Sequence, residues 1–139
     1  MLETERIPRH VYDSLAKEGV DISGIAIAMH CDMNSDHVLC DTYVLASCES
    51  LYIISGNTAI IPRQSRRTPP VEAVWEERSF ISININEIDE LCVEELISAA
   101  RLTLKYKSGE RILLTAMTNT YREAALIFTK YFEKIKNGE

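Results

Sequence analysis

Apolar residues change their spacing twice along the chain, from helical to alternating and back to helical. Within residues 1–20, Val11 and Leu15 lie four positions apart, Pro8 stands at the first turn and Gly19 follows the last one. Proline early and glycine late are typical of a short helix. The pattern therefore predicts a short N-terminal helix with one apolar stripe.

Residues 25–116 contain short runs of β-branched and aromatic residues, most of which alternate with polar positions. These runs predict about seven antiparallel strands in two meanders. The expected runs are 25–33, 38–46, 51–55, 71–75, 80–85, 88–96, 102–106 and 112–116. Residues 57–70 are expected to be mostly loop, because they include prolines, which cannot donate a hydrogen bond to a neighbouring strand.

Helical spacing returns in residues 119–136, where Phe128 and Phe132 share a face opposite charged side chains. Thr120 and Glu123 have the spacing of a capping box, in which two side chains satisfy the first backbone N–H groups of a helix. Gly138 lies where a C-terminal cap belongs. The segment is predicted to be an amphipathic capping helix.

Helices and strands do not alternate along the chain, so no parallel sheet is expected. The expected fold class is α+β: an antiparallel β-sandwich or open barrel of about seven strands, with a short leading helix. Two bent sheets leave an open corner, which Phe128 and Phe132 of the C-terminal helix are expected to close. We expect residues 1–139 to form a single domain.

The chain has 15 basic and 21 acidic residues among 139, a formal charge of −6. Nucleic acid is therefore not an expected partner, because binding phosphates needs a positive surface. Apolar runs are strand-sized, whereas a membrane-spanning helix needs about 20 apolar residues. The first residues lack an apolar signal core and the four cysteines lack paired spacing, so we expect a cytoplasmic protein with reduced thiols.

An acidic segment at 85–89 precedes the later strands, and a helix closes the chain. With the strand pattern before it, this arrangement over residues 25–136 resembles the pleckstrin-homology-like (PH-like) superfold. The resemblance implies two antiparallel sheets capped by the C-terminal helix.

A more specific resemblance rests on apolar and turn positions along most of the chain. These positions are Ile7-Pro8, Leu15, Gly19, Asp32-x-Asn34-x-Asp36, Tyr43-Val44-Leu45, 51–56, 85–89, Glu94, Gly109 and the helix 119–132. There the chain resembles the PH-like N-terminal domain of bacterial ABC transporter ATP-binding and permease proteins.

That resemblance implies a non-catalytic regulatory or protein-interaction module of a transport protein, at the inner face of the cell membrane. Its partners would be other domains of the transporter or another protein. The sequence has no Gly-x-x-x-x-Gly-Lys-Ser/Thr loop for binding phosphates. ATP hydrolysis would therefore belong to another part of that transporter.

Cys31, His37 and Cys40 are the sharpest candidates for chemistry, because thiolate and imidazole groups suit zinc. They raise an alternative hypothesis, a small metal-binding or enzymatic domain. The same spacing fits a hairpin with the two cysteines on adjacent strands and His37 in the turn. We favour the hairpin, since the paired Cys-x2-Cys of zinc sites is missing, and we expect no metal, cofactor or catalytic residue.

Arg63, Arg66 and Arg67 gather positive charge between prolines. Guanidinium groups bind phosphate or carboxylate with paired hydrogen bonds, which makes an anionic lipid headgroup or an acidic peptide a candidate partner. A solvated loop without a partner is the simpler alternative. Trp75 is predicted either in the core or as an exposed anchor beside this loop. An uncovered strand edge would also permit a homodimer.

Overall fold

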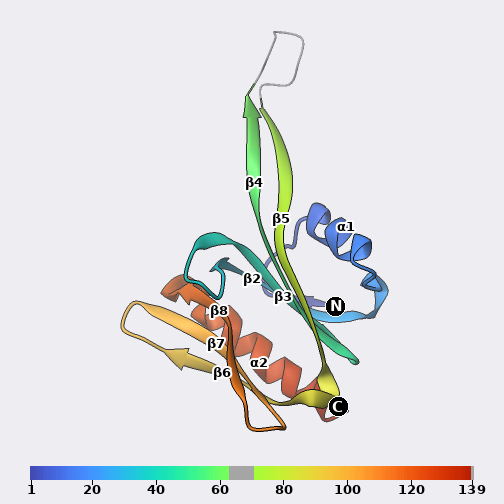
Figure 1. The fold of residues 1–139 in the computed structure, drawn as a ribbon, viewed down its shortest axis with the longest axis vertical. Coiled ribbons are helices and arrows are strands. Elements are labelled where there is room, and N and C mark those ends of the chain that lie inside the picture. Colours follow the sequence, from blue (N-terminus) through green and yellow to red (C-terminus); the bar gives the residue numbers. More distant parts are fainter. Residues whose placement is uncertain (63–70, 139) are drawn as a thin grey trace.

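Two open β-sheets and two α-helices make up residues 1–62 and 71–138, the part of the chain that the computed structural model describes (Figure 1). The strands are β1 (Leu2–Glu3), β2 (Ile25–Met33), β3 (Leu39–Ser47), β4 (Ser50–Pro62), β5 (Val71–Asn84), β6 (Ile88–Glu95), β7 (Ala99–Tyr106) and β8 (Arg111–Thr118). The helices are α1 (Arg9–Lys17) and α2 (Arg122–Lys136), with single 3-10 turns at η1 (Ile22–Gly24), η2 (Ile85–Glu87) and η3 (Asn119–Tyr121). The α+β class is confirmed.

The strand order is β1-β2-β3-β4-β5 in the larger sheet and β6-β7-β8 in the smaller one. Alternating side chains give the larger sheet two apolar faces. One face packs against the smaller sheet and α2, through residues such as Val44 and Leu102. The other packs against Val11 and Leu15 of α1, whose apolar stripe is thereby confirmed. Figure 1 shows the two helices on opposite sides of β2–β5.

α2 closes the main core, as its spacing predicts. Phe128 and Phe132 are buried, with their rings stacked at a centroid separation of 6.5 Å. Burying each phenylalanine contributes about 3 kcal/mol. Gly138 adopts φ +76° just beyond the helix, in agreement with the predicted C-terminal cap.

The N-terminus of α2 differs from the prediction. The helix begins at Arg122, its N-cap is Tyr121, and no side chain caps it. Thr120 belongs instead to the preceding 3-10 turn, so the capping box of Thr120 and Glu123 is wrong. The turn itself continues the chain into the helix, since an Asn119 carbonyl accepts from the N–H of Arg122.

The leading segment also differs from the prediction. β1 pairs in parallel with β2, Leu2 opposite Ile27, so the expectation of an all-antiparallel framework is wrong at this edge. Two of the eight expected runs merge into β5, and the two-residue β1 brings the described strands back to eight. Pro8 is the N-cap of α1 rather than a residue of its first turn. A two-residue strand carries too little periodicity to be recognised in a sequence.

β4 and β5 form a hairpin much longer than expected. Residues 57–62, predicted as loop, continue β4, and the separate strands predicted at 71–75 and 80–85 are one strand. Pro62 is tolerated because it is the last residue of β4. Figure 1 shows this hairpin projecting beyond the other elements.

Turn chemistry in the β2–β3 hairpin agrees with the sequence. The Asn34 side-chain oxygen accepts from the N–H groups of Asp36 and Val38, at 2.9 and 3.1 Å. His37 takes a left-handed backbone conformation, φ 62°. Gly109 likewise turns the β7–β8 hairpin, with φ +96°.

In the described residues, neither helix is long and apolar enough to cross a membrane.

Candidate functional site

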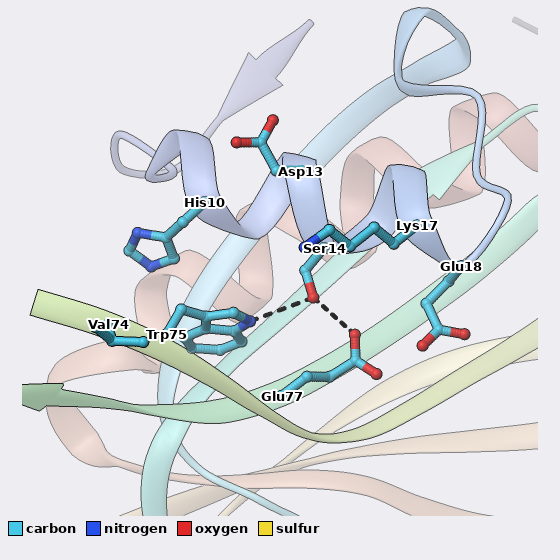
Figure 2. Close-up of a pocket in the computed structure, with 8 residues that line it drawn as sticks. All are labelled: His10, Asp13, Ser14, Lys17, Glu18, Val74, Trp75 and Glu77. Carbon is cyan, nitrogen blue, oxygen red and sulfur yellow. Dashed lines mark hydrogen bonds between the residues drawn. The ribbon is translucent and has the colours of Figure 1, made fainter.

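A hollow of about 570 Å³ lies between α1 and β5 (Figure 2). Its lining residues are His10, Asp13, Ser14, Lys17, Glu18, Val74, Trp75 and Glu77. The first five come from α1 or the residue directly after it, and the last three come from β5. One helix and one strand therefore build the hollow.

Helical periodicity places the α1 side of this hollow. His10, Ser14 and Glu18 are four residues apart, so they follow one line along the helix. This polar line runs beside the apolar stripe of Val11 and Leu15, which faces the sheet. The helix thus buries one stripe and presents the adjacent one to the hollow.

A β-bulge at Arg78 turns Trp75 and Glu77 toward α1. Two consecutive residues of β4 pair with Ser79 and Glu77 of β5, which leaves Arg78 as an extra residue. An extra residue reverses which face of the sheet the side chains before it take, relative to those after it. Without it, Glu76 would face α1 and Trp75 would face away.

Trp75 is half-buried and fixed from several directions. Its Nε1–H donates to the Ser14 hydroxyl at 3.3 Å. The indole stacks on the His10 ring at a centroid distance of 5.3 Å, and the Tyr43 ring meets it edge-on at 6.0 Å. These contacts tie α1 to the bulged part of β5.

Carboxylates gather at the other end of the hollow. The buried Ser14 hydroxyl donates to Glu77 at 2.7 Å (Figure 2). A hydrogen bond with the Glu77 side chain raises the pKa of Glu18, and desolvation and the negative charge of Glu77 act in the same direction. The neighbouring carboxylate therefore makes Glu18 harder to deprotonate than a solitary glutamate would be.

The rim has more negative than positive groups. The lining includes three carboxylates, of Asp13, Glu18 and Glu77, and the single ammonium of Lys17, and Figure 2 shows the Asp13 carboxylate turned away from Trp75 and Glu77. Among residues 1–58 and 74–138, no lysine or arginine forms an ion pair with these three carboxylates. The Nε2 atom of His10 is buried there and has no hydrogen-bond partner among the described side chains. The hollow can therefore accept a cationic group from outside.

A second polar cluster holds the N-terminal segment on the same face of the sheet. The two ring nitrogens of His30 lie 2.6 Å from Glu5 and 2.9 Å from Asp41, and its ring contacts Tyr43 and Tyr121. A neutral imidazole carries one N–H, so donation to both carboxylates needs the imidazolium form. Burial, and then the charges of Asp41 and Glu5, raise the pKa of Tyr43.

The structure places Cys31 and Cys40 on the adjacent strands β2 and β3, with His37 in the turn between them, as the hairpin alternative predicts. Cys31 is buried, its sulfur 3.4 Å from the Thr115 hydroxyl, and burial raises the pKa of its thiol to about 12. His37 is exposed in the hairpin turn, and the Cys40 sulfur lies 3.6 Å from the Thr42 hydroxyl. In the described part of the chain, no group of three or more His, Cys, Asp or Glu side chains is placed to hold a metal ion.

Arg63, Arg66 and Arg67 lie outside the described residues, so their predicted contact with an anionic partner stays a prediction. Trp75 is half-buried and packs against the core cluster beneath α1, so its predicted core position is confirmed in part. Its other predicted place, beside the arginines, lies outside the described residues. The sequence interpretation missed His10, Ser14 and Glu18. Their four-residue spacing beside an apolar stripe is the signal that could have identified them.

No protein-family model, curated protein or solved structure matches this chain.

Proposed function

We propose that the chain is a non-catalytic protein-interaction module with a PH-like arrangement. The support for this arrangement is the order of its elements. The meander β2–β5 is followed by the meander β6–β8, and α2 then fills the core between the two sheets with Phe128 and Phe132. β1 is an addition at the edge of the first meander, and α1 is an addition that covers its outer face.

The observation that carries the interaction role is the hollow beside β5. β5 is the last strand in its sheet, so one of its edges has no strand partner among the described residues. Edge strands offer unpaired N–H and C=O groups to another chain. Val74 and Ile81 also leave 37% and 46% of their surface exposed on this strand. An open edge and a polar hollow together form a surface suited to recognition.

The same side chains argue for binding rather than catalysis. The Ser14 hydroxyl is buried and engaged with both Trp75 and Glu77, which makes it a bridge between α1 and β5. Glu18 and Glu77 lie exposed at the rim, whereas paired acid–base carboxylates are tuned by contrasting, partly desolvated environments. The buried Cys31 thiol, with its pKa raised to about 12, is a poor nucleophile.

We further propose that the module is the N-terminal domain of an ABC transporter ATP-binding protein, on the cytosolic side of the membrane. The turns and apolar positions that carry this resemblance include Asn34 and Gly109, which form the hairpin turns described above. Reading the gene beyond codon 139 tests the proposal. Continuation into a membrane domain and a phosphate-binding loop would support it, and an immediate stop codon among unrelated genes would contradict it.

A photo-crosslinking residue at Val74 tests the interaction role in the cell that carries the gene. The matched control is the same residue at Val38, which is 56% exposed in the β2–β3 hairpin. We expect Val74 to capture a defined transporter segment, identified by mass spectrometry, and Val38 not to capture it. Equal capture at both positions, or none at Val74, would contradict the interaction role of β5.

A further inference from the structure

The hollow indicates which kind of partner the open edge of β5 would take. A strand added to β5 would place every second side chain on the face that carries Trp75 and Glu77. That face is the one that α1 overhangs to form the hollow. A side chain of the added strand would therefore enter the hollow directly.

Charge identifies this side chain as a cation. The carboxylates of Glu18 and Glu77 face the hollow, which has one lysine in its lining, and the whole chain is acidic, with a formal charge of −6. Glu77 lies near enough to raise the pKa of Glu18, so Glu18 gives up its proton less readily beside this second carboxylate. A guanidinium or ammonium group between the two carboxylates would replace that proton and remove their repulsion.

The wall of the hollow suits the stem of a long basic side chain. Trp75 is half-buried and Val74 is 37% exposed, so both offer apolar surface beside the carboxylates. Arginine and lysine pack their methylene groups along apolar surface and keep the charged end in a polar environment. The hollow, of about 570 Å³, has room for one such side chain.

We propose that the hollow binds an extended basic segment of a partner protein, which pairs with β5 and places an arginine or lysine side chain between Glu18 and Glu77, against Trp75. This inference rests on the proposed interaction function and specifies the chemistry of the partner. Main-chain pairing with β5 gives affinity, and the pocket for the cation gives specificity.

A synthetic peptide of alternating valine and arginine tests the proposal on the whole chain. Trp75 is the only tryptophan, so its fluorescence reports on the hollow directly. We expect saturable binding of this peptide, and binding about tenfold weaker when citrulline, the uncharged counterpart of arginine, replaces each arginine. Equal affinity for the two peptides, or no saturable binding of either, would overturn the proposal.

Variants of the chain locate the binding site. The double variant Glu18→Gln, Glu77→Gln keeps an acceptor for Ser14, and we expect it to weaken arginine-peptide binding by about tenfold. Glu94→Gln with Glu110→Gln removes the same charge from exposed positions in β6 and the β7–β8 turn and should change affinity less than about twofold. Equal weakening by both pairs would show non-specific attraction and contradict the site.

Changes in the backbone amide NMR shifts identify which strand edge binds the peptide. We expect the arginine peptide to shift the amide resonances of β5. The amide resonances of β6, one of the two edge strands of the smaller sheet, should not change. Shifts confined to β6 or α2 would overturn the proposal. If Val74 crosslinks a defined partner while neither peptide binds, the interaction function stands and the basic-segment inference fails.

Discussion

Gly56 of β4 lies directly against the indole of Trp75. A Cβ atom at Gly56 would be 2.7 Å from Cζ2 of that ring and 2.3 Å from the Glu76 carbonyl oxygen. Both distances are too short for non-bonded atoms, so only glycine allows the bulged strand and the indole to approach this closely. The shape of the hollow thus depends on a residue that does not line it.

Gly56→Ala is expected to lower the free energy of unfolding by about 2 kcal/mol, the cost of overpacking a rigid contact. Gly24→Ala is the matched control, because the added methyl group would meet only an Asp21 oxygen at 3.9 Å. Denaturant unfolding followed by circular dichroism measures both variants. A Gly56→Ala protein as stable as Gly24→Ala would contradict the close contact with Trp75.

Phe132→Ala should lower the free energy of unfolding by about 3 to 5 kcal/mol, because it leaves a cavity in the main core. Tyr131→Ala removes a neighbouring aromatic ring that is 40% exposed and should cost far less. Urea unfolding compares the two variants. Similar losses would mean that α2 does not seal the core through the Phe128 and Phe132 face.

Glu18→Gln is expected to raise the melting temperature at neutral pH. Folding raises the pKa of Glu18, so the folded chain holds this proton more tightly than the unfolded chain does. Wild-type stability should therefore fall as pH rises through that raised pKa, whereas the variant lacks this loss. Thermal melts over a pH series should show the two proteins converge on acidification.

Glu110→Gln removes one exposed carboxylate from the β7–β8 turn and serves as the charge-matched control for Glu18→Gln. It should not reproduce the pH-dependent gap. A constant gap between Glu18→Gln and wild type at every pH would contradict the raised pKa of Glu18 at the rim of the hollow.

His37→Gly should stabilise the β2–β3 hairpin, because His37 adopts φ 62° and glycine reaches this conformation without strain. The expected gain in unfolding free energy is up to about 1 kcal/mol. Ser35→Gly in the same turn adds only flexibility to the unfolded chain and should not stabilise it. A loss of stability in His37→Gly, measured by urea unfolding, would contradict the turn geometry.

Long periodic segments could be predicted from the sequence. The apolar stripes predicted both helices, α1 and α2, and the turn residues Asn34 and Gly109 predicted the positions of two hairpins. The β4–β5 hairpin was harder, because the bulge at Arg78 interrupts the alternation and makes one strand look like two. β1 is too short to carry any period.

The candidate site was largely beyond prediction from the sequence. Trp75 was recognised as a candidate anchor, but its partner Ser14 is 61 positions away along the chain. The bulge at Arg78 changes which side chains of β5 face α1, and only for this reason does Glu77 lie near Ser14 and Glu18. Cys31, His37 and Cys40 show the converse, since their spacing suggested a metal site, whereas the fold buries Cys31 against Thr115 and leaves His37 exposed in the turn.

The indole N–H resonance of the chain's only tryptophan tests the hollow between α1 and β5 most directly. Because Trp75 donates to Ser14 and stacks on His10, we expect nuclear Overhauser contacts from this N–H to Ser14 and from the indole ring to His10. The Ser14→Ala variant should shift the resonance and retain the His10 contacts. An indole N–H in rapid exchange with water, with no contact to either α1 residue, would contradict the hollow and the partner recognition built on it.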